Sequence, residues 1–260
     1  MTVELATTAH GERGTPLVIL HGLLGSARNW TTIAKRLGET YRVFALDLRN
    51  HGTSPWAPTM TYDDMAEDVR AFIEDNALDP AILLGHSMGG KVAMRLALLY
   101  HDLVDRMIVA DIAPAAYHQS YDEFIDAMRA VPLGHMMRRG EVDQALQPAV
   151  PDPGMRAFLM QNLARQDEGF SWRPNLDAIA MNMDDLLGWP DPLGATFDGP
   201  TLFIAGANSD YLPRSSRPKI EAIFPDARFA TIQDAGHWVH AEKPAEFLQI
   251  AGRFLEATSL

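Results

Sequence analysis

The chain has 260 residues, of which 47% are hydrophobic, so it can bury a large core as one domain with an insertion. Its formal net charge of −12, with no basic run, argues against nucleic acid and anionic membranes as partners. The absence of cysteine excludes disulfides, thiolate metal sites and cysteine nucleophiles.

The segment Met1–Gly14 carries Glu4 and lacks the charged and long apolar regions of a secretory signal peptide. No stretch approaches the ~18 consecutive apolar residues of a membrane-spanning helix. We therefore expect a cytoplasmic protein without a membrane span, and we expect a monomer or a small homo-oligomer.

Strand-like and helix-like segments alternate along the chain. Continuous apolar runs, such as Pro16–Leu20, are typical of strands that are buried on both faces of a sheet. The predicted strands are Thr2–Ala9, Pro16–Leu20, Tyr41–Leu46, Ala81–Leu84, Met107–Ala110, Leu202–Ala205 and Arg228–Ile232. The predicted helices cover about 30–37, 61–79 (begun by Thr61 or Asp63), 91–100 and 244–255. This order predicts an α/β fold with a mostly parallel, doubly wound sheet and an active site at the carboxyl ends of its strands.

Residues 116–190 break this alternation. They are rich in Met, Pro and Arg, have helical spacings, and show no clear strand. We expect residues 1–115 and 191–260 to form the core, and 116–190 to form an all-helical cap over the strand ends. Most apolar side chains of the cap would form its own core, and a minority would line an acyl pocket.

The motif Gly85-His86-Ser87-Met88-Gly89 lies between a predicted strand and a predicted helix. A G-x-S-x-G in this position is the nucleophile elbow, a strained turn that exposes the serine above the sheet. Ser87 is therefore the predicted nucleophile.

A serine hydroxyl needs a base within hydrogen-bond reach, and the base needs an orienting acid. His237 directly follows the last predicted strand, in a loop where Gly236 permits a tight bend toward the sheet. We predict His237 as the base. His240 is nearby, but it precedes a helix and is expected to have a structural role.

The negative charge that develops on the substrate oxygen needs two backbone N–H donors. One is expected from Met88, at the start of the helix after Ser87. The other is expected from the loop after the strand Pro16–Leu20, where Leu23 is the best candidate.

These motifs, with His21-Gly22 first and Gly236-His237 last, resemble the α/β-hydrolase superfamily. A closer resemblance, to the small YbfF-type esterases, runs from about Pro16 to Leu255. It rests on Asp47-Leu48-Arg49-Asn50-His51-Gly52, Gly85-His86-Ser87-Met88-Gly89-Gly90-Lys91, Asp111-Ile112-Ala113-Pro114, Trp172-Arg173-Pro174-Asn175 and Ala235-Gly236-His237-Trp238-Val239-His240-Ala241-Glu242-Lys243-Pro244.

The resemblance bears on the third member of the triad. Most α/β-hydrolases place the acid after the strand that follows the cap, which here offers Asp210. YbfF-type proteins place it after the strand that precedes the cap, which here offers Asp111. The two strands should be neighbours, so either carboxylate could reach His237. The resemblance favours Asp111, and Asp210 is the alternative.

Together these residues predict a serine hydrolase that cleaves esters of short to medium acyl chains through an acyl-enzyme, without a metal or an organic cofactor. The resemblance also implies acyl thioesters as substrates. Carbon–carbon bond hydrolases and cofactor-free perhydrolases use the same residue types and are alternatives. A catalytically silent ligand-binding protein is the non-enzyme alternative. Asp47 and Arg49 are expected to fix a loop, and Lys91 to be solvated or paired.

Overall fold

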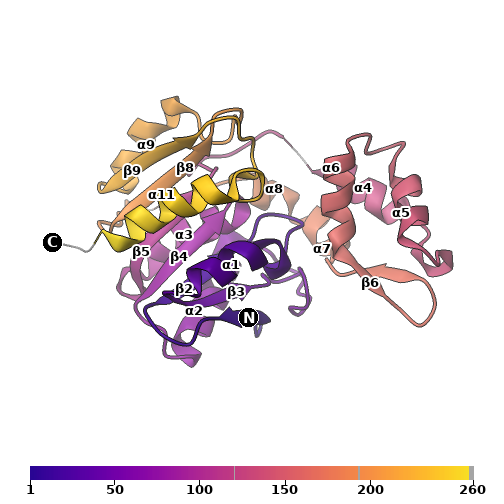
Figure 1. Ribbon diagram of the computed structural model, residues 1–260, viewed down its shortest axis with the longest axis horizontal. Coiled ribbons are helices and arrows are strands. Elements are labelled where there is room, and N and C mark those ends of the chain that lie inside the picture. Colours follow the sequence, from indigo (N-terminus) through magenta and orange to yellow (C-terminus); the bar gives the residue numbers. More distant parts are fainter. Residues whose placement is uncertain (120, 193, 258–260) are drawn as a thin grey trace.

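Figure 1 shows the computed structural model, which describes residues 1–119, 121–192 and 194–257. Its centre is a seven-stranded sheet with the strand order β1-β3-β2-β4-β5-β8-β9. All neighbouring strands are parallel except β1, which pairs antiparallel with β3. The strands are β1 (Thr7–His10), β2 (Pro16–Leu20), β3 (Arg42–Leu46), β4 (Ala81–His86), β5 (Val104–Ala110), β8 (Thr201–Gly206) and β9 (Ala227–Ile232).

Helices cover both faces of the sheet, so the predicted fold class is confirmed. On one face, α1 (Thr31–Leu37) and α11 (Pro244–Glu256) pack against the sheet through buried residues such as Ile33 and Phe247. On the other face lie α2 (Tyr62–Asp75), α3 (Met88–Leu99) and α9 (Arg217–Ile223). Short helices link these elements: η1 (Ala27–Trp30), η2 (His101–Leu103), η5 (Arg214–Ser216) and α10 (Val239–Glu242).

Local sequence explains several element ends. Thr61, one of the two predicted helix starters, is the N-cap of α2, because its side chain accepts a hydrogen bond from the Asp64 backbone N–H. The first strand begins later than predicted, at Thr7 instead of Thr2. This strand, β1, lies at the edge of the sheet, and most of its residues are exposed. The apolar pattern that marks buried strands is therefore missing there.

The residues between β5 and β8 form a lobe beside the sheet (Figure 1). Its elements are α4 (Asp122–Ala130), η3 (Leu133–His135), α5 (Arg139–Leu146), α6 (Pro153–Leu159), η4 (Met160–Asn162), β6 (Leu163–Arg165), β7 (Phe170–Trp172) and α7 (Leu176–Met181); α8 (Met183–Leu187) follows it.

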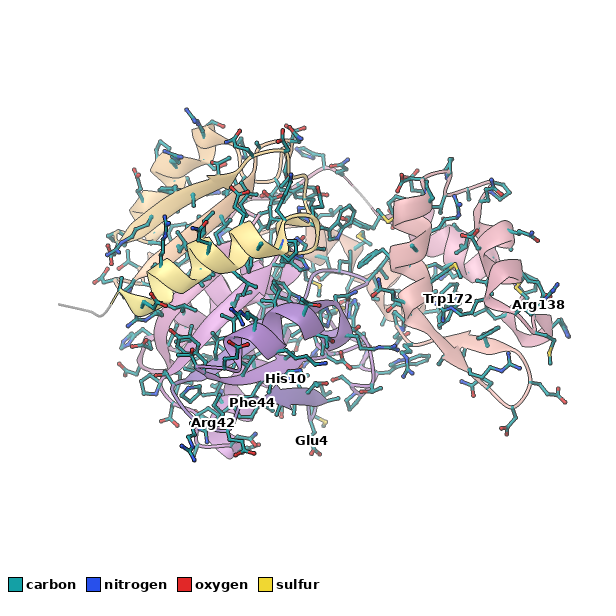
Figure 2. All side chains as sticks on the ribbon, in the orientation of Figure 1. Glu4, His10, Arg42, Phe44, Arg138 and Trp172 are labelled. Carbon is teal, nitrogen blue, oxygen red and sulfur yellow. The ribbon has the colours of Figure 1, made fainter. Side chains whose placement is uncertain are left out.

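The prediction of an all-helical insertion was wrong, because β6 and β7 form an antiparallel hairpin. Strands of three residues are too short to show a period of two, so the sequence pattern does not reveal them. Gly169, with a φ of 71°, makes the turn between them. Trp172 lies in this lobe (Figure 2), where its indole N–H donates to the Met128 carbonyl of α4 at 2.8 Å.

The carboxyl ends of the parallel strands lie at one edge of the sheet. There, β2 leads into His21, β4 into Ser87, and β5 into Asp111, while the loop after β9 carries His237. The fold therefore brings together residues that are far apart in the sequence.

Candidate active site

Ser87 lies in a sharp turn between β4 and α3, with φ 52° and ψ −121°. For a residue other than glycine, such a conformation costs on the order of 1–3 kcal/mol. A Cβ on Gly85 would lie 2.2 Å from the Gly89 carbonyl oxygen, and a Cβ on Gly89 would lie 2.3 Å from that of Leu20. The two glycines thus allow the turn to close, which explains the spacing of the motif.

A chain of hydrogen bonds joins a hydroxyl, an imidazole and a carboxylate. His237 Nε2 lies 3.0 Å from Ser87 Oγ, and His237 Nδ1 lies 2.8 Å from Asp111 Oδ2. Because a carboxylate only accepts, the proton of the neutral ring belongs on Nδ1, and Nε2 is free to accept the Ser87 hydroxyl proton. This arrangement can activate a serine for attack on a carbonyl carbon.

The Asp111 carboxylate is completely buried and fixed by further donors. Its Oδ1 accepts the Gly206 backbone N–H at 2.9 Å, and its Oδ2 accepts the Ser209 hydroxyl. Asp111 itself has a φ of 52°, so the chain turns sharply after β5. These contacts hold the carboxylate within hydrogen-bond distance of His237 Nδ1.

The alternative acid, Asp210, is exposed and has no part in this chain of hydrogen bonds among the described residues. β5 and β8 are neighbours, as expected, but the chain after β8 directs the Ser209 hydroxyl toward Asp111 and leaves Asp210 exposed. No hydrogen bond within the described residues joins Asp210 to His237. The structure thus joins Ser87, His237 and Asp111 by hydrogen bonds, and within the described residues it does not join Asp210 to them.

Two contacts that sequence reasoning missed hold the His237 loop. Tyr211 stacks on the His237 ring, with 3.9 Å between the ring centroids. His86, the residue before the serine, donates from Nε2 to the His237 carbonyl oxygen at 2.8 Å. Burial lowers the pKa of His86 well below its usual value, so the ring is neutral.

The loop after β2 carries Leu23, and Met88 begins α3. Within the part of the chain that the structure describes, neither backbone N–H donates a hydrogen bond to the protein. The next residue, Leu24, is fixed by the protein: its N–H donates to His51 Nε2 at 3.0 Å, and its carbonyl accepts from Asn162 Nδ2 at 2.8 Å. Two unused donors thus lie on a loop and a helix end that are held rigidly beside Ser87.

The loop after β3 is fixed by Asp47 and Arg49, as expected. Asp47 accepts the backbone N–H groups of Ala27 and Thr53, each at 2.8 Å. Arg49 donates to backbone carbonyl oxygens, and it also forms an ion pair of 2.6 Å with the buried carboxylate of Asp68, which was not predicted.

The expectation for Lys91 was wrong. Its side chain is only 2% exposed, and within the described residues no carboxylate forms an ion pair with it. Its Nζ donates to the carbonyl oxygens of Leu187 (3.2 Å) and Gly188 (2.6 Å), and it lies 4.7 Å from the centroid of the Tyr117 ring. Burial lowers the pKa of Lys91 to about 7. The segment after α8 covers this face of α3, which local sequence does not reveal.

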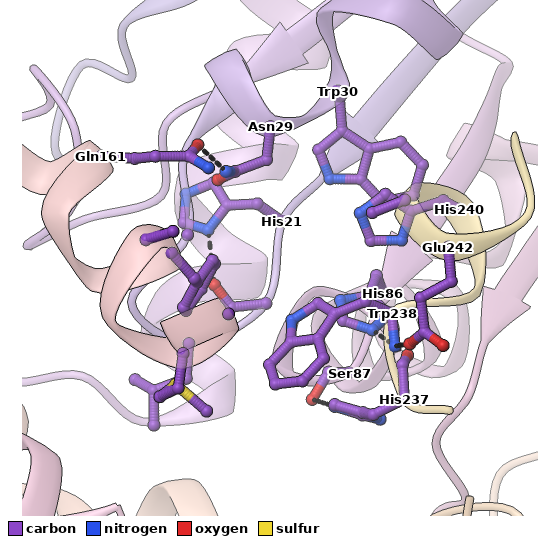
Figure 3. A pocket seen from close by; sticks show the side chains of 18 of the residues that line it. His21, Asn29, Trp30, His86, Ser87, Gln161, His237, Trp238, His240 and Glu242 are labelled. Carbon is purple, nitrogen blue, oxygen red and sulfur yellow. Dashed lines mark hydrogen bonds between the residues drawn. The ribbon is translucent and has the colours of Figure 1, made fainter. Parts of the chain in front are cut away.

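Two cavities meet at Ser87. The larger has a volume of about 640 Å³ and lies between the core and the lobe; Figure 3 shows Ser87 and His237 in its wall, with Trp30, His240 and Gln161 further along. The smaller has a volume of about 40 Å³ and extends over α3 toward α8. Both are lined by protein groups that could contact a substrate bound at the serine.

Within the described residues, no group of three or more His, Cys, Asp or Glu side chains could hold a metal ion. The same residues include no helix with the length and hydrophobicity needed to cross a membrane.

Comparison with known proteins agrees with this architecture. The chain is 39% identical to the sn-1-specific diacylglycerol lipase ABHD11 of Danio rerio, over 93% of this chain and 78% of that protein. It is 34% identical to the esterase YbfF of Escherichia coli, over 98% of both chains. The solved structure of a marine microorganism esterase superposes with a TM-score of 0.93 at 38% identity, covering 97% of this chain and all of that one.

Residues 17–250 match the model of the alpha/beta hydrolase family, and the chain belongs to that family. Within it, the chain is an enzyme of the esterase and lipase type, and the resemblance to YbfF-type esterases is confirmed.

Proposed function

We propose that the protein hydrolyses carboxylic esters by two-step acyl transfer, with Ser87 as nucleophile, His237 as general base and acid, and Asp111 as the group that orients the imidazole. The observation that carries this proposal is the hydrogen-bonded chain from Ser87 Oγ through His237 to the buried Asp111 carboxylate. Its support from the relatives is that they are named as an esterase and a lipase.

In the first step, His237 takes the hydroxyl proton, and Ser87 attacks the ester carbonyl carbon. The N–H groups of Leu23 and Met88 stabilise the negative oxygen of the tetrahedral intermediate. His237 then gives its proton to the leaving alcohol, and the acyl group stays on Ser87. In the second step, His237 activates a water molecule, which releases the acid.

Asp111 stabilises the imidazolium that forms in each step, and its contacts with Gly206 and Ser209 keep it in place. Asp210, which is exposed and forms no hydrogen bond to His237 among the described residues, has no part in this scheme.

The lobe, together with α8, serves as the cap that the sequence predicts for residues 116–190. Support comes from the larger cavity, which is lined by Ser87 and His237 on the core side and by Met155 and Phe158 on the lobe side. Apolar walls of this kind suit a hydrolase of esters, or acyl thioesters, of short to medium acyl groups.

Titration with an active-site serine phosphonate tests the proposal. We expect stoichiometric labelling of the wild-type enzyme at Ser87 and none of Ser87→Ala, with loss of ester hydrolysis in the same variant. A series of p-nitrophenyl esters of graded chain length then tests the cap. Equal rates for all lengths would contradict a size-selective pocket, and a ligand-binding protein without catalysis would show no labelling.

A further inference from the structure

The two cavities share a wall but differ in the groups that line them. Leu23, Ser87 and Tyr121 line both cavities. Met88 lines only the smaller one, and His237 lines only the larger one. A substrate carbonyl bound at Ser87 can therefore extend one substituent into each cavity.

The chemistry at His237 decides which substituent enters which cavity. In the proposed mechanism the leaving oxygen must receive a proton from His237 Nε2, so the alcohol must be on the side of that ring. The ring faces the larger cavity, and the acyl chain has the remaining direction, past Met88, into the smaller one.

We infer that the acyl group occupies the smaller cavity and the alcohol the larger one, so the enzyme selects esters of small acyl groups with bulky alcohols. This inference rests on the proposed function of Ser87 and His237 and adds the division of the substrate between the two cavities.

The size of the smaller cavity limits the acyl group. A group the size of a water molecule, such as a methylene, needs roughly 10–15 Å³ of cavity volume. The smaller cavity, with about 40 Å³, therefore holds roughly three carbon atoms of the acyl chain beyond the carbonyl. Its apolar wall includes Ile112, Met183 and Leu186. Acyl groups up to about butyryl therefore fit without movement of the wall.

Hydrogen bonds between distant parts of the chain hold this wall in place. The Tyr62 hydroxyl donates to the Leu186 carbonyl oxygen at 2.7 Å, and Lys91 Nζ donates to the Gly188 carbonyl oxygen at 2.6 Å. The first hydrogen bond joins α2 to α8, and the second joins α3 to the residue that follows α8. Widening the cavity for a long acyl chain would require breaking them.

The larger cavity has room for a bulky alcohol. Its volume is about 640 Å³, and its walls include the apolar side chains of Met155, Phe158 and Trp238, two of which, Phe158 and Trp238, lie 5.7 Å apart between ring centroids. Arg28 and Glu242 also line it, so the cavity accepts an apolar body with a polar end.

Two isomeric esters, hexyl acetate and ethyl hexanoate, test the inference on the wild-type enzyme. They have the same atoms and both release a primary alkanol, so they differ only in the side of the ester that carries the long chain. Since each excess methylene in a filled pocket costs about tenfold or more in kcat/KM, we expect hexyl acetate to be preferred by at least about tenfold.

Variants of the smaller cavity then test whether its wall limits the length of the acyl group. Met183→Ala and Leu187→Ala each widen the smaller cavity, and we expect each to shift the kcat/KM ratio toward ethyl hexanoate by about tenfold. Met181→Ala is the matched control, because Met181 is 74% exposed on α7 and outside both cavities. The control should keep the wild-type ratio.

Equal use of the two esters by the wild type, or a preference for ethyl hexanoate, would overturn the inference while phosphonate labelling of Ser87 upholds the proposed function. Hydrolysis of neither ester, together with no labelling at Ser87, would overturn both. The wild-type comparison needs no variant, so poor folding of Met183→Ala or Leu187→Ala would not prevent the test.

Discussion

Lys91→Met should remove a pH dependence of stability that comes from one buried cation. Lys91 Nζ is held by two carbonyl oxygens and lies over an aromatic ring, without a carboxylate partner among the described residues. Its burial disfavours the charged form, and this lowers its pKa from 10.5 to about 7 in the folded protein.

The sign of the effect follows from proton binding. Between about pH 7 and 10.5, the unfolded chain holds a proton on Lys91 that the folded protein has released. The free energy of unfolding therefore rises with pH in this window. At about 1.4 kcal/mol per pH unit, and with folded Lys91 half protonated at pH 7, the rise between pH 7 and 9 is about 2 kcal/mol.

Methionine has a similar length and no titrating group. The difference in unfolding free energy, wild type minus Lys91→Met, should thus increase by about 2 kcal/mol from pH 7 to pH 9. Urea unfolding followed by circular dichroism at the two pH values measures it, and other titrating groups cancel in the difference. Lys35→Met, which removes an exposed lysine on α1, controls for the loss of one positive charge. A wild-type minus Lys91→Met difference that is the same at both pH values would refute the reasoning.

Three further predictions concern the site and its surroundings. Asp111→Asn should lower kcat for ester hydrolysis by about 10⁴, because an amide cannot stabilise the imidazolium, whereas Asp210→Asn should stay within about threefold; single-turnover rates that rank them the other way would exchange their roles. Ser209→Ala removes a hydroxyl donor from Asp111, so kcat should fall by about ten- to hundredfold with little change in KM; unchanged kcat would show that this hydrogen bond does not hold the carboxylate. Burial lowers the pKa of His240 from 6.5 to about 3, so the unfolded chain binds more protons in that range and stability falls by up to about 1.4 kcal/mol per unit as pH decreases. His240→Phe keeps an aromatic ring on Trp30, and its unfolding free energy, measured with urea, should fall less than that of the wild type between pH 7 and pH 5; equal falls in the two proteins would contradict this prediction.

Local sequence was sufficient for the parts of the site that depend on backbone shape. The two glycines of the elbow predicted the turn at Ser87, because no other residue fits where their Cβ atoms would lie. The position of His237 after the last strand followed from the rule that parallel strands end at one edge. The choice between Asp111 and Asp210 came from family resemblance alone, since both follow neighbouring strands.

Contacts between distant residues were beyond local sequence. Ser209 meets Asp111 across 98 positions, and Lys91 meets Gly188 across 97, so neither contact leaves a pattern in its own segment. A lysine on a helix usually lies in solvent. Only the packing of the segment after α8 shows that this one is buried beside the serine.

Buried neutral histidines support the backbone on both sides of the proposed reaction centre. His51 accepts the Leu24 N–H and donates to the Arg49 carbonyl oxygen, which a neutral ring can do and a protonated ring cannot, because protonation removes the acceptor. Burial lowers the pKa of His51 to about 3, so the ring keeps its acceptor over the neutral and mildly acidic range. The Leu24 N–H adjoins that of Leu23, and the direction of the proposed oxyanion donor therefore depends on a ring that is not among the groups lining either cavity. His237 differs from His51 in having the Asp111 carboxylate on its Nδ1, which is the partner that stabilises a protonated ring. The same side chain type thus has a fixed hydrogen-bonding role at one position and, in the proposed mechanism, moves a proton at the other; the group that meets Nδ1 distinguishes the two.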